Sequence, residues 1–404
     1  MARPFVIRFI YKTCMLAACI ILALSCEEET FSPSRSGSFM KHFGTYLYDE
    51  GSDIIRVPDG GYAFTGNTVT DDYVQKIVLY RTDRYGNPMW DRKIFGGSYL
   101  SSANRIIVLR DGGFAILGNT YADTKHRIPV SNMYLVRTDA WGNTMWTKSY
   151  GGFSNETGYD LVETADRGLL LVGKTEDFEK ERTDVIMIRT DHQGDTLWTR
   201  RYGGPGNDAA ISVAATQNGF VFAGYSRSFA QPGQAGLNIL VAKVNQLGRI
   251  TYPFTYGGAG NDSGVAITPA PAGGYYLLGT TTDPATRIKN IFLTRIQEDI
   301  SAALWTKTIG GAVTHTASGF RVTPEGDVVI TGTQEISDVN HAIFLIKIDA
   351  AGNEVFSKTY GGTGKQRAAA IELSDDGGYV IIGSSEQGGN SMITLLKTKA
   401  DGTL

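Results

Sequence analysis

The chain has 404 residues, of which 42% are hydrophobic and 11% aromatic, so it can bury a substantial core. Its net charge of −3 lacks the basic excess of nucleic-acid-binding proteins, and we expect no nucleic-acid partner. All three cysteines, Cys14, Cys19 and Cys26, lie near the N-terminus, which excludes a disulfide framework or a cysteine-based metal site in the rest of the chain. The 49 glycines against 12 prolines favour many tight turns.

The first 25 residues have the pattern of a signal peptide. A basic beginning with Arg3, Arg8 and Lys12 precedes an apolar run over residues 14–24. This run is too short to span a bilayer comfortably but is typical of the apolar region of a signal peptide. An uncleaved membrane anchor is the alternative interpretation.

The end of this run resembles a bacterial lipobox, in which a cysteine is lipidated and becomes the first residue of the mature protein. Leu22 to Ser25 stand before Cys26, although Ala23 occupies the position usually held by leucine. Residues 16–19 match the consensus more closely, but they leave almost no apolar run before Cys19. We therefore predict lipidation at Cys26, with Cys19 as the alternative.

The segment after Cys26 contains an acidic triplet, Glu27 to Glu29, that resembles the export signal of surface lipoproteins in Bacteroidota. Residues 30–37 have the composition of a flexible tether. The predicted organisation is a signal peptide over 1–25, the lipidated cysteine and tether over 26–37, and a folded domain over 38–404. We expect an outer-membrane lipoprotein exposed at the cell surface, with a periplasm-facing orientation as the alternative.

One motif runs seven times through the rest of the chain. Each copy ends an apolar run on a marker glycine, and successive marker glycines are 51 to 55 residues apart. They are Gly66, Gly118, Gly173, Gly224, Gly279, Gly332 and Gly383. So regular a period predicts a repeat architecture.

Each copy contains four short strand patterns separated by turn residues. Turns such as Asp59-Gly60-Gly61 and Gly142-Asn143 supply the positive φ angles that tight hairpins require. Four-stranded units repeated radially form propellers. We therefore predict an all-β fold, a seven-bladed β-propeller of four-stranded blades.

Three further positions recur in all seven copies. A small residue stands fifteen positions before each marker glycine, where inner strands crowd the axis: Gly51, Ala103, Gly158, Ala209, Gly264, Ala317 and Ala368. An aromatic residue opens the fourth strand and is expected to lie between blades: Phe39, Trp90, Trp146, Trp198, Tyr252, Trp305 and Phe356. A cation lies in the third strand: Arg81, Arg137, Arg189, Lys243, Arg295, Lys347 and Lys397. Because these residues recur in every blade, we interpret them as structural.

The two ends of the repeat predict how the ring closes. The first strand pattern, Phe39–Phe43, is of the fourth-strand type, whereas the last copy supplies only three strands before Leu404. We expect the N-terminal strand to complete the C-terminal blade, which removes the free edges of the ring.

The segment Thr138 to Trp146, with Asp139, Gly142 and Asn143, is similar to the tryptophan-docking motif of quinoprotein-type (PQQ-like) propellers. The turn is one residue shorter than in that motif, and the sixth copy has Gln297-Glu298-Asp299 instead. The resemblance implies the scaffold and little about activity.

Motifs of catalysis are missing from the sequence. It contains no Gly-x-Ser-x-Gly nucleophile elbow, and its five histidines are scattered without metal-ligand spacing. Asn207-Asp208 and Asn261-Asp262 are interpreted as turn residues rather than Ca²⁺ ligands. We therefore predict no catalytic residues, no metal site and no cofactor.

Candidate ligand-binding residues are those that differ between copies in the loops of one face. They are Tyr99, Tyr121, Phe153, Glu156, Tyr225, Asp262, His315 and Arg367. Aromatic rings beside polar groups suit a protein partner or a glycan. An ordinary polar rim with isolated aromatics is the alternative interpretation.

Two functions are compatible with these patterns. The first is a non-enzymatic binding or scaffold lipoprotein that docks on an outer-membrane protein complex or captures a surface glycan. The alternative is a propeller enzyme, namely a hydrolase, a lyase or a quinoprotein-like oxidoreductase, whose site lies at the central face. Clustering of Glu156, Asp262, His315 and Arg367 around one central pocket would favour the enzyme.

Overall fold

The computed structural model describes residues 37–45, 47–122, 130–230, 236–361 and 364–404, and these contain 28 β-strands. The predicted signal peptide, the lipidation sites Cys26 and Cys19, and the tether lie outside the described residues. Within the described ranges, no helix is long and apolar enough to cross a membrane.

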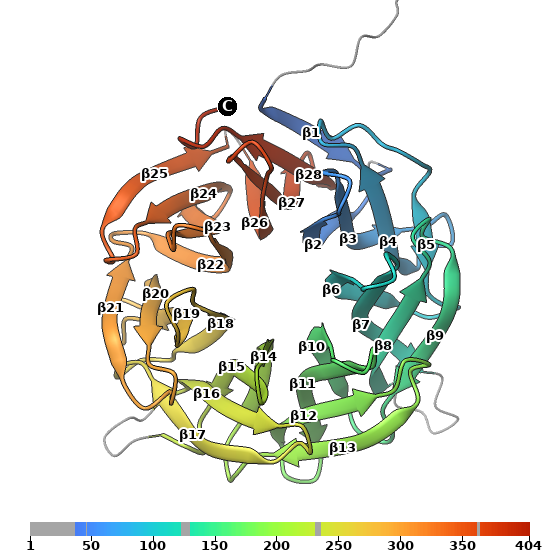
Figure 1. The fold of residues 1–404 in the computed structure, drawn as a ribbon. Coiled ribbons are helices and arrows are strands. Elements are labelled where there is room, and N and C mark those ends of the chain that lie inside the picture. The colour runs from blue at the N-terminus through green and yellow to red at the C-terminus, as the bar shows by residue number, and fades with distance from the viewer. Residues whose placement is uncertain (1–36, 46, 123–129, 231–235, 362–363) are drawn as a thin grey trace, which may run out of the picture. The chain divides into compact units, whose positions relative to one another are not determined.

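The strands form seven antiparallel units of four, arranged as blades around a central axis (Figure 1). The innermost strands are β2 (Asp49–Arg56), β6 (Ser101–Val108), β10 (Glu156–Glu163), β14 (Asp208–Thr216), β18 (Ser263–Pro269), β22 (Thr314–Val322) and β26 (Lys365–Leu373). The second strands are β3 (Tyr62–Val69), β7 (Phe114–Ala122), β11 (Leu169–Asp177), β15 (Gly219–Ser226), β19 (Tyr275–Thr282), β23 (Val328–Ser337) and β27 (Tyr379–Gln387).

The outer half of each blade is built in the same order. The third strands are β4 (Gln75–Thr82), β8 (Val130–Thr138), β12 (Arg182–Thr190), β16 (Asn238–Asn245), β20 (Lys289–Ile296), β24 (Asn340–Ile348) and β28 (Asn390–Thr398). The outer strands of blades 1 to 6 are β5 (Lys93–Phe95), β9 (Thr144–Tyr150), β13 (Thr196–Tyr202), β17 (Ile250–Tyr256), β21 (Ala303–Ile309) and β25 (Glu354–Tyr360). Blade 7 takes its outer strand from the beginning of the ring, as β1 (Phe39–Phe43).

The predicted closure of the ring is confirmed. Strand β1 pairs antiparallel with β28, with Phe39 opposite Lys397 and Phe43 opposite Ile393. Blades 6 and 7 are also joined, through a short parallel contact of β24 with β26 that places His341 opposite Lys365. The all-β fold and its seven blades therefore agree with the prediction from the repeat.

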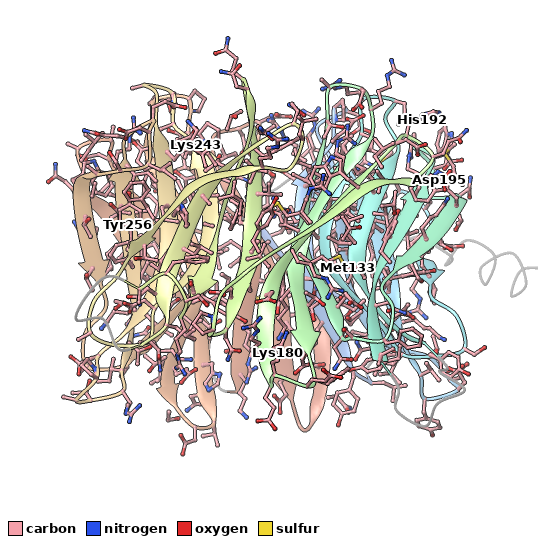
Figure 2. The ribbon with its side chains drawn as sticks, turned by 90° about the horizontal axis from the view of Figure 1, so that it is seen from below. Met133, Lys180, His192, Asp195, Lys243 and Tyr256 are labelled. Carbon is pink, nitrogen blue, oxygen red and sulfur yellow. The ribbon has the colours of Figure 1, made fainter. Side chains whose placement is uncertain are left out.

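Each blade contributes loops to two opposite faces. We call the loop face the one that carries the connections from each outer strand to the next inner strand and from second to third strands. We call the turn face the one that carries the inner-to-second and third-to-outer turns. Figure 2 shows Lys180, from a β11–β12 connection, near one face, and His192 and Asp195, from a β12–β13 turn, near the other.

The core lies between the blades. The described residues form seven hydrophobic clusters, and each contains side chains of two neighbouring blades. The cluster at the closure combines Phe43 and Ile393 of blade 7 with Phe64 and Tyr80 of blade 1. Apolar surface is therefore removed from water at every blade junction, which is the main stabilisation available to such a ring.

Six of the seven recurrent aromatic residues lie between blades, as predicted, and the side chain of the seventh, Tyr252, lies outside the described part of the structure. The Trp146 ring of blade 2 covers Gly194 in the β12–β13 turn of blade 3, where an added Cβ would lie 2.7 Å from the ring. The Tyr150 hydroxyl donates a hydrogen bond to the Gly194 carbonyl at 2.7 Å. The same aromatic-on-glycine contact joins Phe39 to Gly86, Trp90 to Gly142, Trp198 to Gly248, Trp305 to Gly352 and Phe356 to Gly402.

The recurrent third-strand cations also have structural partners. In five blades the cation binds a carboxylate in the inner-to-second turn of its own blade: Arg81 to Asp59, Arg137 to Asp111, Arg189 to Asp166, Lys347 to Asp327 and Lys397 to Asp376. Lys243 instead binds Glu298 of the next blade, at 3.0 Å. These contacts fasten turns to strands and support the structural interpretation.

One blade differs from the other six in the register of its inner strand. In six blades the small residue fifteen positions before the marker glycine lies directly opposite that glycine, but in blade 4 Ala210, not Ala209, pairs with Gly224. Strands β14 and β15 are joined by only two residues, because Thr216 already pairs with Gly219. The shorter turn moves the equivalent position by one residue.

Candidate functional site

Three of the four predicted aromatic candidates are exposed on the loop face. Phe153 is 87% exposed, and Tyr99 and Tyr121 are also exposed. Three further exposed rings, which the sequence analysis did not select, lie in neighbouring connections on the same face: Tyr48, Tyr73 and Phe178. We call these six residues the aromatic arc. Tyr121 lies near the end of β7, and the other five lie in connections that enter blades 1 to 3 or lie within them.

The arc is confined to one side of the ring. Among the described residues, no aromatic side chain in the loop-face connections of blades 4 to 7 is comparably exposed. Tyr225 of blade 4 is partly buried in β15, and burial raises the pKa of its hydroxyl. Tyr73 is 86% exposed and adopts a φ of 59°. A left-handed conformation is uncommon for an aromatic residue, so the turn holds this ring outward at a cost in backbone strain.

The predicted acidic candidates, by contrast, are buried. Glu156 is 1% exposed and Asp262 is fully buried. The Asp262 carboxylate accepts a hydrogen bond from the Gly258 amide at 2.6 Å, and Glu156 accepts one from the Gly152 amide at 3.4 Å. Each carboxylate thus caps the loop that enters its blade.

Equivalent carboxylates cap two other loops. Asp49 accepts from the Thr45 amide at 2.6 Å, and Asp208 accepts from the Gly204 amide at 3.0 Å. The capped loops of Asp49 and Glu156 carry Tyr48 and Phe153 of the aromatic arc. The buried acids therefore shape the loops that display the exposed rings.

The Glu156 carboxylate is buried and hydrogen-bonded. Burial raises the pKa of its carboxyl, and the Thr175 hydroxyl, which donates to Oε1 at 3.1 Å, opposes this shift. The Arg201 guanidinium lies 3.8 Å from Oε1 on the exposed side.

The two remaining candidates lie on other blades. The His315 ring packs 5.7 Å from the Phe344 ring, with Nδ1 3.0 Å from the Val313 carbonyl. Arg367 is exposed on β26. The cavity on the propeller axis is not lined by His315, Arg367, Glu156 or Asp262. The described residues contain no group of three or more His, Cys, Asp or Glu side chains that could hold a metal ion.

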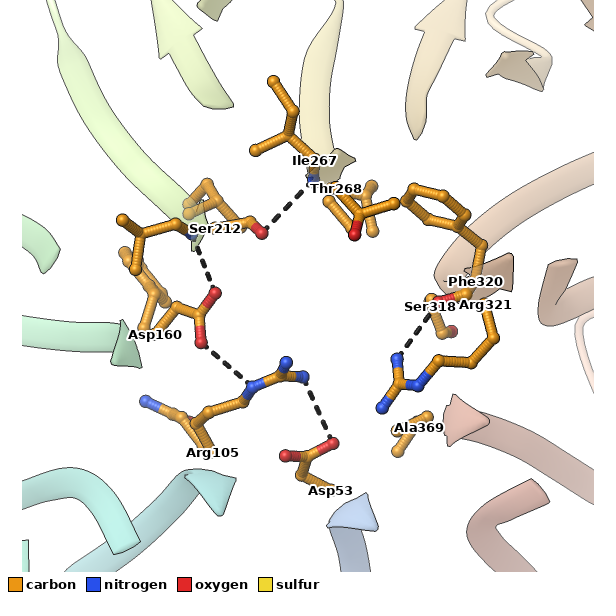
Figure 3. Close-up of a pocket in the computed structure, with 18 of the residues that line it drawn as sticks. Asp53, Arg105, Asp160, Ser212, Ile267, Thr268, Ser318, Phe320, Arg321 and Ala369 are labelled. Atoms are coloured by element: carbon orange, nitrogen blue, oxygen red, sulfur yellow. Dashed lines mark hydrogen bonds and ion pairs between the residues drawn. The ribbon is translucent and has the colours of Figure 1, made fainter. Parts of the chain in front are cut away.

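A second candidate site, which the sequence analysis did not identify, is the channel along the propeller axis. It encloses about 570 Å³ and is lined by the inner strands (Figure 3). A β-bulge follows the small residue of every inner strand, and two consecutive residues at each bulge line the channel: Ser52 and Asp53, Asn104 and Arg105, Tyr159 and Asp160, Ile211 and Ser212, Val265 and Ala266, Ser318 and Gly319, and Ala369 and Ala370.

Five charged side chains in this channel form what we call the channel network: Asp53, Arg105, Asp160, Arg321 and Glu372. Arg105 lies between two carboxylates, with Nη1 3.4 Å from Asp53 Oδ1 and Nε 2.9 Å from Asp160 Oδ1. Arg321 of blade 6 lies on the other side of Asp53 (Figure 3). It pairs with Glu372 of blade 7 at 3.1 Å. The network thus connects blades 1, 2 and 3 and, separately, blades 6 and 7.

The carboxylates of the network also bind backbone amides of the following blade. Asp53 Oδ2 accepts from the Ile106 amide at 2.9 Å, and Asp160 Oδ2 accepts from the Val213 amide at 2.8 Å. Burial raises the pKa of Asp53, and the nearby Arg105 and Arg321 guanidinium groups oppose this shift. The carboxylates of Asp160 and Asp53 raise the pKa of Arg105, which holds it in the charged form.

One sequence signal could have pointed to the channel. Thirteen residues before the marker glycine stand Asp53, Arg105 and Asp160 in blades 1 to 3, whereas blades 5 to 7 have Ala266, Gly319 and Ala370. Charged residues at a position otherwise held by small ones break the repeat. The bulge that turns this position toward the axis has no composition signal of its own.

Comparison with known proteins supports the fold. No family model matches the chain. A curated relative, the regulatory protein FlaEY of Caulobacter vibrioides, is 25% identical over 144 residues, which is 32% of this chain and only 15% of that protein.

Solved structures show the same architecture at low sequence identity. Puromycin hydrolase superposes with a TM-score of 0.54 and 14% identity, over 90% of this chain and 52% of that one. The β-propeller domain of the Trilobed protease from Pyrococcus furiosus superposes with a TM-score of 0.50 and 12% identity, over 89% and 96% of the two chains. That domain has an open velcro topology, whereas β1 closes the ring here. These similarities establish a β-propeller and leave its activity open.

Proposed function

We propose that this protein is a non-enzymatic binding or scaffold lipoprotein of the outer membrane, exposed at the cell surface, and that it engages a protein partner through the aromatic arc. The observation that carries the proposal is the gathering of six exposed rings on one side of one face. Exposed aromatic residues are enriched at the centres of protein interfaces, where they bury large areas at low entropic cost. A surface glycan, which also stacks on aromatic rings, is the alternative ligand.

Two of the capped loops support this proposal because they order two rings of the arc, Tyr48 and Phe153, before binding. Phe153 lies between Gly152 and Glu156, whose hydrogen bond fixes the loop ends. Tyr48 lies in the corresponding loop held by Asp49. Loops that are already in their bound conformation lose less entropy on association.

A pull-down tests the proposal. The parent protein and the double variant Tyr73→Ala/Phe153→Ala are each crosslinked in membranes and then purified with what they have captured. Tyr73 and Phe153 are chosen because their side chains are the most exposed of the arc. We expect at least about tenfold weaker capture of the partner, since hot-spot aromatics contribute roughly 2 kcal/mol or more each. The control is Trp141→Ala, an exposed aromatic on the turn face. Equal capture by all three proteins would remove the arc as the binding surface, and a strong glycan-array signal without a protein partner would favour the glycan.

The lipid anchor is proposed at Cys26. Strand β1 begins at the turn face, because Phe39 lies opposite Lys397 near the end of β28. The first strand of the ring therefore begins on the face opposite the aromatic arc, which is compatible with an anchor that leaves the arc accessible. The variant Cys26→Ser should lose incorporation of labelled fatty acid and leave the membrane fraction, whereas Cys19→Ser should keep both; the reverse pattern would assign the anchor to Cys19.

The second candidate function is a propeller enzyme, a hydrolase, lyase or quinoprotein-like oxidoreductase, with its site in the channel. The charged cluster there favours it. The binding function is preferred because every carboxylate of the channel network is paired with a guanidinium group, so none is a free general base. Turnover of a substrate panel that is lost on changing channel residues, but not arc residues, would reverse this preference.

A further inference from the structure

The channel presents guanidinium groups to its lumen while their counter-ions lie behind them. The Arg105 side chain is 33% exposed, compared with 3% for Asp53 and 6% for Asp160. In the second pair Arg321 is 25% exposed and Glu372 14%. A molecule in the channel therefore meets hydrogen-bond donors first, although the network as a whole has one more acidic than basic group.

The guanidinium groups are also aimed toward a common space. Figure 3 shows those of Arg105 and Arg321 reaching into the channel from either side of Asp53. The hydrogen bond and the closest ion pairs of Arg105 use Nη1 and Nε, and no hydrogen bond among the described residues uses its Nη2. Arg321 already donates from Nε and Nη2 to Glu372 and from Nη1 to the Phe320 carbonyl, so only the second hydrogens of its two Nη atoms remain for a ligand. Arg105, with its Nη2 unused, is therefore the stronger donor of the two to a carboxylate oxygen.

The rest of the lumen is small or apolar. The channel position held by charged residues in blades 1 to 3 is held by Ala266, Gly319 and Ala370 in blades 5 to 7. Because these residues are small, they leave open the space that the charged side chains face. Ile211, Val265 and Phe320 add apolar lining. A cavity of about 570 Å³ is within the range that holds small organic ligands.

We propose that the central channel binds a small carboxylate-bearing molecule with an apolar body, its carboxylate on Arg105 and Arg321. The apolar body lies against the side of blades 4 to 6. This site is distinct from the aromatic arc, which lies in the loops of blades 1 to 3. The carboxylates of the network hold both guanidinium groups in place, so they are positioning residues for the ligand.

Two probes of equal shape test the charge requirement. Benzoate and the neutral benzamide are titrated into the full-length protein and followed by calorimetry and by ligand-observed NMR. We expect benzoate to bind at millimolar concentrations or below and benzamide at least about tenfold more weakly. Equal binding of the two probes, or no binding of benzoate at millimolar concentrations, would overturn the proposal.

Two variants test the location without leaving an unpaired buried charge. Arg321→Met/Glu372→Leu removes one guanidinium together with its partner, a replacement that stability usually tolerates. Gly319→Leu fills the lumen, and it has room, since an added Cβ would have only the Ala370 Cα within 4 Å, at 3.8 Å. We expect both variants to unfold as the parent does and to bind benzoate at least about tenfold more weakly.

The outcomes separate this site from the aromatic arc. The Tyr73→Ala/Phe153→Ala protein should bind benzoate as the parent does, so the failure of either proposal leaves the other standing. Parent-like benzoate binding by the folded Gly319→Leu protein would place the probe outside the channel and refute the inference.

Discussion

Buried carboxylates hold this ring together at the level of single residues. Asp53 and Asp160 each accept an amide of the following blade, so each carboxylate links its own blade to the next. Glu156 instead bonds within its own loop and blade, through Gly152 and Thr175. A buried acceptor with fixed donors is stabilising, but the charge it carries is costly to bury.

The substitution Glu156→Gln separates the cost of burying the charge from the stabilisation by hydrogen bonding. Burial raises the folded-state pKa of Glu156 above its unfolded value, so the folded protein holds this proton at higher pH than the unfolded chain. The contribution of Glu156 to stability is therefore largest at low pH and falls as the pH rises through the folded-state pKa. Glutamine keeps an acceptor for Thr175 and carries no charge.

We expect the Gln variant to be more stable than the parent at pH 7, by on the order of 1 kcal/mol, and equal to it near pH 4. Urea unfolding at both pH values measures the difference, with Glu354→Gln as an exposed control. A variant that is less stable at pH 7 would mean that the Arg201 ion pair and the Gly152 hydrogen bond, which the NH2 group of glutamine cannot accept, together outweigh the cost of burying the charge.

At the level of elements, neighbouring blades are joined where the outer strand of one blade contacts the third-to-outer turn of the next. The Trp146 ring on Gly194 and the Tyr150 hydrogen bond to the same residue form one such junction. Gly194 has a φ of 80°, a conformation that glycine adopts without strain. The turn thus needs glycine for two reasons, its backbone angle and the ring above it.

Gly194→Val places a β-branched side chain at a left-handed backbone position and beneath the Trp146 ring. We expect a loss of roughly 3 kcal/mol in the free energy of unfolding, from left-handed strain together with overpacking against the indole. Thermal and urea unfolding measure it. The control is Gly311→Val, where no atom lies within 4 Å of an added Cβ and φ is outside the left-handed range. Equal losses at both positions would show that the indole contact contributes nothing.

For the whole molecule, the architecture could be predicted from the sequence because the same residue types recur at a regular spacing. Marker glycines and aromatic residues recur once per blade, and the fourth-strand pattern at Phe39 predicted the closure. The channel network was missed because a bulge adds one residue, and one residue changes the side of the strand that a side chain faces.

The candidate site was predictable only in part, for a related reason. Composition identifies a polar or aromatic loop residue but not its direction. Phe153 and Glu156 are three residues apart, yet one is exposed and the other buried. The hydrogen bond to Gly152, which turns Glu156 inward, depends on loop geometry that no pattern of residue types encodes.

Closure of the ring depends on the last residue of the N-terminal strand. Phe43 packs 5.0 Å from the Phe64 ring and 5.3 Å from the Tyr80 ring, so the strand that completes blade 7 also contacts blade 1. Phe43→Ala should cost about 3–5 kcal/mol of stability, as for other buried aromatics, and should expose β1 to proteolysis before the rest of the ring. Met40→Ala, on the exposed side of the same strand, should change stability by less than about 0.5 kcal/mol. Urea unfolding together with limited proteolysis measures both effects. If Phe43→Ala were no more susceptible than Met40→Ala, hydrogen bonding to β28 alone would suffice to close the ring.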